Sequence, residues 1–164
     1  MKKHLLAVLL LLLPISSTAE PDKEPLDVQE WLIGCVGLSN GNIAMSMDIN
    51  CVALAVDYCT MGRLVPQRSA CTTDLVSFFV SRSNIILAGL PDIPPNVSTV
   101  KTRLYQSRLE RLRTNEVDGA CLPPEVSVNG TPGICHIAEA GLRWIEARSL
   151  ARVAIEQNNE VINP

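Results

Sequence analysis

Six cysteines give this chain of 164 residues its clearest capacity for chemistry. They are Cys35, Cys51, Cys59, Cys71, Cys121 and Cys135. Zinc sites made of cysteine usually contain close pairs such as Cys-x-x-Cys, whereas the intervening gaps here are 15, 7, 11, 49 and 13 residues. The even count and the wide spacing favour structural disulfides over a metal centre or a redox-active thiol pair. We therefore predict no metal and no cofactor.

The spacing limits how these cysteines can pair, although six cysteines allow 15 connectivities. Cys51 and Cys59 lie on one predicted helix, about 12 Å apart along its axis, which is too far for a bond between them. Each should therefore join a different neighbouring element. Cys121 and Cys135 bracket the loop sequence LPPEVSVNGTPGI and are the pair that the spacing favours most. The other four would then connect the first three helices.

Catalytic groups are scarce. His136 is the single histidine after the first 19 residues, and no Gly-x-Ser-x-Gly sequence is present. Asp48 and Asp57 are about 13 Å apart along a helix, too far for the paired carboxylates of a glycosidase. We expect them to accept hydrogen bonds or to pair with arginines, for which the candidates are Arg63, Arg68 and Arg82. The chain is therefore predicted not to be an enzyme.

The first residues, MKKHLLAVLLLLLPISSTAE, have the charged start, short apolar core and small residues of a secretory signal peptide. Cleavage is expected after Ala19, which leaves residues 20–164 as a single helical domain, periplasmic or secreted, without stable membrane insertion. Without Lys2 and Lys3, the 14 Lys and Arg become 12 against 17 Asp and Glu, a net charge of −5. This balance does not favour nucleic acid as a partner.

Helix signals predict an all-α bundle of about five helices that disulfides hold together. The expected helices cover residues 25–37, 43–61, 71–88, 97–113 and 132–157. The expected amino-terminal residues or caps are Pro25, Asn42, Ser69 or Thr72, Asn96 and Thr131. The helix over residues 43–61 should be central, because its only charged residues are Asp48 and Asp57.

Basic residues gather on the helix over residues 97–113. They are Lys101, Arg103, Arg108, Arg111 and Arg113, interrupted only by Glu110. The apolar stripe expected on the opposite side is Val97, Val100, Leu104, Leu109 and Leu112. The basic face, Arg103, Arg108 and Arg111 above all, could dock an acidic partner or lie near anionic envelope polymer. A solvated helix surface is the simpler alternative.

Two segments resemble a known family. These are residues 35–59, CVGLSNGNIAMSMDINCVALAVDYC, and residues 142–148, LRWIEAR. Together they resemble the LprI-type lysozyme-inhibitor domain, whose members are small, exported, helical and cross-linked by disulfides. Trp144 and Arg148 are the two residues carried over from the resemblance, as expected partner contacts, and no inhibitory residue is carried over. The helix pattern favours a core position for Trp144, with an interface as the alternative. The chain departs from the family pattern because it lacks a Leu-Asn pair after the early cysteines and because Cys135 precedes the Trp-Arg segment.

These patterns lead to one prediction of function. The chain is expected to be an exported protein that docks a protein partner, and one activity consistent with this is inhibition of a cell-wall hydrolase such as lysozyme. Two alternatives stay open. The chain could be a structural or accessory subunit of an envelope or secretion complex, or a small envelope enzyme that uses Asp57 and His136.

Overall fold

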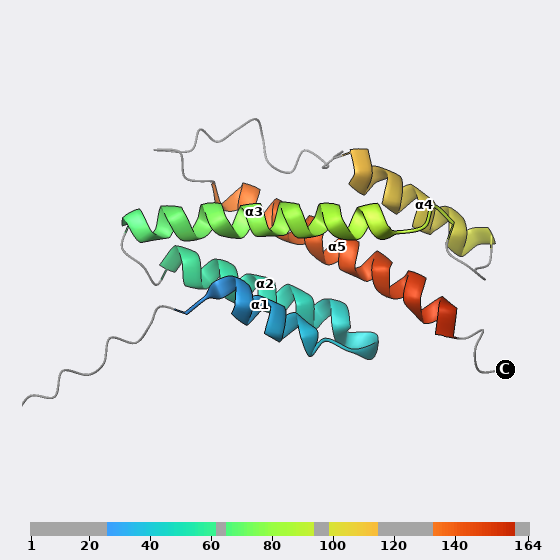
Figure 1. Cartoon of the computed structure of the whole chain (residues 1–164), viewed down its shortest axis with the longest axis horizontal. Helices are drawn as coiled ribbons and strands as arrows, with labels where there is room; N and C mark the ends of the chain where they lie inside the picture. The colour runs from blue at the N-terminus through green and yellow to red at the C-terminus, as the bar shows by residue number, and fades with distance from the viewer. Residues whose placement is uncertain (1–25, 62–64, 94–98, 115–132, 160–164) are drawn as a thin grey trace, which may run out of the picture.

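The computed structural model describes residues 26–61, 65–93, 99–114 and 133–159 (Figure 1). Within these ranges the chain forms five α-helices, one short 3-10 helix and no strand, which confirms the predicted all-α bundle. The elements are α1 (Val28–Gly37), η1 (Gly41–Ile43), α2 (Ala44–Met61), α3 (Val65–Gly89), α4 (Thr99–Thr114) and α5 (Ile134–Asn159). The predicted signal peptide, Cys121 and most of the loop between Cys121 and Cys135 lie outside the described residues.

The first two helices begin at residues other than those predicted. Asp27 caps α1, because its Oδ1 accepts the backbone N–H groups of Gln29 (2.9 Å) and Glu30 (3.1 Å). The predicted start, Pro25, lies outside the described residues. Asn42 does not cap α2 but lies within η1, directly after Gly41 with its positive φ of 62°. The predicted caps Asn96 and Thr131 of the last two helices also lie outside the described residues.

The prediction that the third helix begins at residue 71 is wrong, because α3 already begins at Val65. Pro66 is its second residue, where a proline costs little since the first N–H groups of a helix have no partner within it. The hydroxyl of Thr72 donates to the carbonyls of Arg68 (2.9 Å) and Ser69 (3.0 Å), one turn back within the same helix. Ser69 and Thr72 are therefore interior helical residues and not caps.

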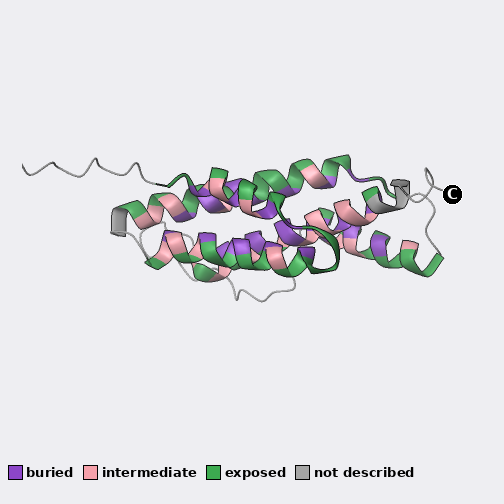
Figure 2. Ribbon diagram, turned by 90° about the horizontal axis from the view of Figure 1, so that it is seen from below, coloured by how far each residue is buried: buried purple, intermediate pink, exposed green. Residues whose placement is uncertain are grey.

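The two longest helices, α3 and α5, pack against each other and form the centre of the bundle (Figure 1). The α1–α2 hairpin covers one side of this pair, and α4 lies against the part of α3 and α5 that the hairpin leaves uncovered (Figure 1). Buried residues face inward between the helices (Figure 2). The expectation that the helix over residues 43–61 is central is wrong, because one side of α2 faces solvent.

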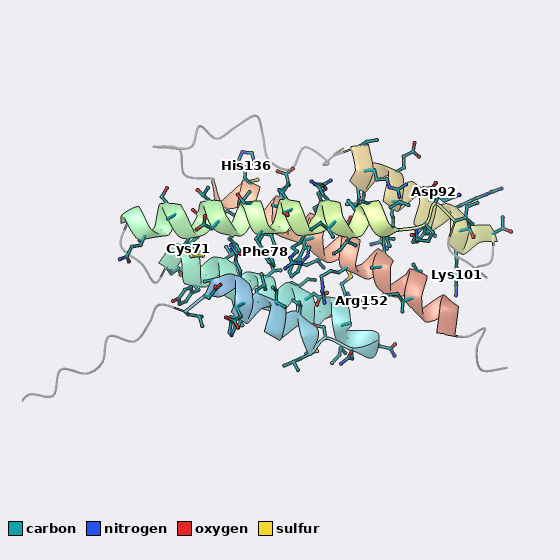
Figure 3. The ribbon with its side chains drawn as sticks, viewed as in Figure 1. Cys71, Phe78, Asp92, Lys101, His136 and Arg152 are labelled. Carbon is teal, nitrogen blue, oxygen red and sulfur yellow. A yellow bond between two sulfur atoms is a disulfide. The ribbon has the colours of Figure 1, made fainter. Side chains whose placement is uncertain are left out.

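Two hydrophobic cores share this central pair. The first core joins α1, α2, α3 and α5, and the second joins the end of α3 to α4 and the later part of α5. Three aromatic residues form the middle of the first core, where the Trp144 ring centroid lies 5.5 Å from that of Phe78 and 5.4 Å from that of Phe79. Phe78 lies between α3 and the hairpin (Figure 3). Aromatic pairs at these distances add stability beyond the burial of their area.

Disulfides connect the first three helices, as predicted. Cys35–Cys51 joins α1 to α2, and Cys59–Cys71 joins α2 to α3, with Cα atoms 5.9 and 5.4 Å apart. Each bond constrains the unfolded chain and contributes about 2–4 kcal/mol. Cys135 is also disulfide-bonded, whereas Cys121, its predicted partner, is outside the described residues. Intramolecular disulfides are typical of an oxidising, extracytoplasmic environment.

The close approach of α2 and α5 depends on a glycine. A Cβ atom at Gly141 would lie 2.8 Å from Val52 Cγ1 and 3.5 Å from Phe79 Cε2. Both neighbours belong to the first core, and Phe79 is fully buried, so neither side chain can move away easily. The missing side chain of Gly141 therefore sets the distance between these helices.

We predict that Gly141→Ala lowers the free energy of unfolding by about 1–3 kcal/mol, because the added methyl group overpacks the core. Gly34→Ala is the matched control, since no atom lies within 4 Å of a Cβ built there. That control should stabilise α1 by about 0.5–1 kcal/mol through helix propensity. Urea unfolding of both variants with disulfides intact measures the difference, and equal stability of the two would contradict the packing argument.

Candidate partner-binding surface

The α1–α2 hairpin is almost free of charge on its outer side. Between Trp31 and Met61 the sequence has two charged residues, Asp48 and Asp57. Asp48 is completely buried, so Asp57 is the one exposed charge in these 31 positions. Large apolar side chains are exposed there instead: Ile33, Leu38, Ile43, Met45, Ile49, Leu54 and Met61. They are spread over α1, the connection to α2 and two flanks of α2, with the exposed Ser46, Asn50 and Asp57 between those flanks, and we call these seven residues together the hairpin face.

Exposed apolar residues are common when scattered, but a group of them without charges is typical of a contact surface. The cores of protein–protein interfaces are depleted in charged residues and enriched in residues such as methionine. The hairpin face matches this composition. The disulfide Cys35–Cys51 fixes α1 against α2 beneath it, so little order would be lost when a partner binds.

A buried ion pair holds the hairpin to α5. Arg148 Nε lies 3.0 Å and Arg152 NH1 2.8 Å from Asp48 Oδ2. Arg148 NH2 also donates to the carbonyl oxygen of Val36 in the last turn of α1, at 2.9 Å. One arginine of α5 therefore binds both helices of the hairpin, and Arg152 extends from α5 towards α2 (Figure 3).

Burial raises the pKa of the Asp48 carboxyl, but the hydrogen bonds from Arg148 and Arg152 outweigh it, so the pKa lies below its ordinary value. Asp48 is therefore ionised in the folded protein at neutral pH. Asp48 pairs with two arginines of the last helix and not with the predicted Arg68 or Arg82, while the third candidate, Arg63, lies outside the described residues. The sequence signal for this pairing is the spacing of Arg148 and Arg152, which are four residues apart and so share one helix face.

Gly41–Met61 is long and apolar enough to cross a membrane if length and composition alone are considered. A core helix of a soluble protein can pass the same test, and a third of this segment is buried within the bundle. Asp48 lies in the middle of the segment and is bound to α5. An intramembrane charge is costly, so this ion pair favours the position of α2 within the bundle.

The basic residues predicted to bind a partner have different environments on α4. Arg103 is exposed and Arg108 is half-buried. Arg111 forms an ion pair with Glu146 of α5 at 3.0 Å, and this intramolecular contact partly neutralises its charge. The predicted apolar stripe is also partly wrong. Tyr105, Leu109 and Leu112 face the core, whereas Val100 and Leu104 are exposed.

The two residues inferred from the family resemblance lie inside the bundle. Trp144 is 3% exposed and packs in the first core, so it cannot contact a partner in this structure. Arg148 binds Asp48, and its Cζ lies 5.2 Å from the Trp144 ring centroid, within reach of a cation–π interaction. The geometry of both residues supports a structural role. For Trp144 this is the core position that the helix pattern favours.

The groups considered for catalysis show no convergence in the part of the chain described. His136 Nδ1 lies 3.5 Å from Glu139 Oε2, one turn along α5, and is partly exposed. Asp57 is exposed on α2. Among the described residues, no group of three or more His, Cys, Asp or Glu side chains could hold a metal ion.

Two hollows lie where the start of α1 meets α3, with volumes of about 450 and 380 Å³. Gln29 and Asp74 line both hollows. Gln29 Nε2 donates a hydrogen bond of 3.5 Å to the backbone carbonyl oxygen of Asp74. Their linings mix apolar and polar side chains: Leu75 and Asp27 line the larger hollow, and Phe78 and Arg82 line the smaller one. The hairpin therefore has an apolar outer face and a hollowed, more polar edge.

Comparison of this chain with known protein families, with curated proteins and with solved structures gives no match. The resemblance to the LprI-type domain therefore stays a prediction, and the geometry described above carries the functional argument.

We predict that Asp48→Asn lowers the free energy of unfolding by about 3–5 kcal/mol, because it leaves two partly buried guanidinium groups without their carboxylate. Asp57→Asn is the matched control on the same helix and should change stability by less than about 0.5 kcal/mol, since Asp57 is exposed. Chemical denaturation at neutral pH measures both. A cost for Asp48→Asn as small as that of the control would contradict the ion-pair argument.

The same carboxylate should make stability depend on pH. The pKa of Asp48 is lower in the folded chain than in the unfolded chain, where an aspartate titrates near ~3.9. Its contribution is therefore complete above that value and is lost as the pH falls through the lower, folded-state pKa. Thermal melts at decreasing pH should show this loss in the wild type, and Asp48→Asn should lack that component.

Proposed function

We propose that the mature chain is an exported binding protein that docks a protein partner through the hairpin face. The observation that carries this proposal is the surface of the α1–α2 hairpin, where seven large apolar side chains accompany one exposed charge. Exposure of such a surface to water is unfavourable. Its burial against a partner contributes roughly 25 cal/mol of favourable free energy per Å² of apolar area. Two disulfides make the surface rigid before it binds.

The place of action that we propose is the periplasm or the extracellular space. The disulfides support this, because such bonds persist in oxidising compartments. The predicted signal peptide over residues 1–19 agrees with it. A helical domain that two bonds cross-link also resists unfolding and proteolysis where a secreted protein meets proteases.

A cell-wall hydrolase such as lysozyme is the partner class that we propose first, and its inhibition is the proposed activity. Export and the sequence resemblance of residues 35–59 and 142–148 to lysozyme inhibitors support this choice. In this proposal the chain is not an enzyme: it binds the hydrolase surface and blocks access of substrate.

One observation favours a second candidate, a subunit of a stable envelope or secretion assembly. Interfaces that are permanently buried are more apolar than those that form and separate, and the hairpin face is apolar with a single nearby charge. Such a subunit would migrate in native gels of envelope extracts with an assembly much larger than 17.8 kDa. An inhibitor would migrate alone or with one enzyme.

A matched pair of substitutions tests the docking face. Leu54 on α2 is 56% exposed and Leu104 on α4 is 60% exposed, and α4 lies against α3 and α5 rather than α2. Leu54→Asp should weaken partner binding at least tenfold, since it places a charge within the apolar contact, whereas Leu104→Asp should leave it unchanged. The measurement is inhibition of lysozyme and of a cell-wall amidase, together with binding to the partner captured from envelope extract.

Equal loss of binding for the two variants would contradict the assignment of the hairpin face. Absence of inhibition of either hydrolase, with no partner captured at micromolar concentration, would contradict the proposed function as a whole. Thermal melts of both variants verify that the substitutions, which are at exposed positions, leave the fold intact.

A further inference from the structure

The ends of α3 and α4 lie close to Arg143 in the third turn of α5. Arg113 NH2 donates to the carbonyl oxygens of Leu87 (3.2 Å) and Leu90 (2.9 Å) at the end of α3. Arg143 NH2 donates to the carbonyl oxygen of Leu112 near the end of α4, at 3.0 Å. Each arginine therefore satisfies carbonyl groups that a helix carboxy terminus leaves without partners.

A pocket of about 190 Å³ lies between these two arginines. Its lining consists of Asn84, Leu87, Ala88, Arg113 and Arg143. A water molecule occupies about 30 Å³ in the liquid, so the pocket has room for an anionic group of several heavy atoms. Its polar side chains are two guanidinium groups, which only donate hydrogen bonds, and one amide, which can donate two.

The two arginines differ in their charge balance. Arg113 forms an ion pair with the exposed carboxylate of Asp92, which lies three residues after the end of α3 (Figure 3). Arg143 has no carboxylate within ion-pair distance among the described residues, whereas Arg111, Arg148 and Arg152 each have one. The buried Nε of Arg143 also has no hydrogen-bond partner in that part of the chain.

Desolvation makes this arrangement costly. Burial lowers the pKa of the Arg143 guanidinium below its ordinary value, because desolvation disfavours the charged form. A buried donor without a hydrogen-bond partner is unfavourable, and more so when it is charged. An anion beside Arg143 would remove part of that cost, and it would meet the charge of Arg113 on the other side of the pocket.

We propose that the pocket between α3, α4 and α5 is an oxyanion site that takes a carboxylate or phosphate group. The Arg143 guanidinium supplies a charge that no carboxylate of the described residues pairs with, Arg113 adds a second guanidinium, and the Asn84 amide donates from α3. Guanidinium groups match the planar oxygens of carboxylates and phosphates, which favours these anions over chloride. The hairpin face lies on other helices, so this site does not depend on the proposed function.

The probes for the test are inorganic phosphate and acetate, each titrated into the mature, oxidised protein at constant ionic strength set with sodium chloride. Chemical shifts of the Asn84 side-chain amide and of Arg143 Nε–H are followed by NMR. At least one probe should produce a saturable change at both groups with a Kd of about 1–10 mM, as expected for a small ion. Saturation by phosphate alone or by acetate alone identifies which anion the site prefers.

Two variants at one exposed position make the test specific. Asn84→Asp places a negative charge in the pocket and should weaken binding at least tenfold, and Asn84→Leu should weaken it through loss of the amide donors. Thr73→Asp is the matched control, because it adds the same charge at an exposed position of α3 three turns away. It should bind as the wild type does.

Three results would overturn the proposal. They are shifts that rise linearly without saturation for both anions, shifts that sodium chloride reproduces, and undiminished binding by Asn84→Asp. Because Asn84 is exposed, its variants should melt within a few degrees of the Thr73→Asp control, which separates loss of the site from loss of the fold.

Discussion

The position of the hairpin depends on one buried carboxylate. Asp48 has no exposed surface, yet it is charged, so it requires counter-charges that only α5 supplies. Arg148 meets this requirement and at the same time binds the last turn of α1 through Val36. Buried ion pairs stabilise less than apolar packing of equal volume, but they are specific, because any shift of α2 along α5 would leave charges unpaired.

Arginines connect neighbouring helices in the same way at both ends of the bundle. Arg113, Arg143 and Arg148 each donate to a carbonyl oxygen near the end of a neighbouring helix, which are α3, α4 and α1 respectively. A helix carboxy terminus carries partial negative charge, so a guanidinium from another helix both satisfies the carbonyl groups and stabilises that dipole. The relative positions of the helices are therefore specified by charged contacts as well as by the two hydrophobic cores.

This division of roles explains how an apolar face can remain exposed on a stable protein. The cores, the disulfides and the arginine contacts hold the hairpin without any contribution from its outer side. Ile49 and Leu54 are 42% and 56% exposed, and this accessibility is the basis of the proposed function. The oxyanion site that we propose rests on the same arginine contacts, since Arg143 is placed by its bond to α4 and has no carboxylate partner among the described residues.

The helical class, the approximate extent of most helices and the use of the first four cysteines to connect them can all be predicted from the residues alone. These features depend on local signals, such as glycine and proline positions, and on the limited reach of a disulfide. The folded chain was needed to learn that α3 and α5 are central, that α3 begins at Val65, and that Asp48 pairs with Arg148 and Arg152 across 100 and 104 positions. Such pairings depend on how helices approach in space, which their periodicity does not specify. For the same reason the sequence marked Trp144 and Arg148 as notable residues, whereas their burial against Phe78 and Asp48 followed from the packing of α5 alone.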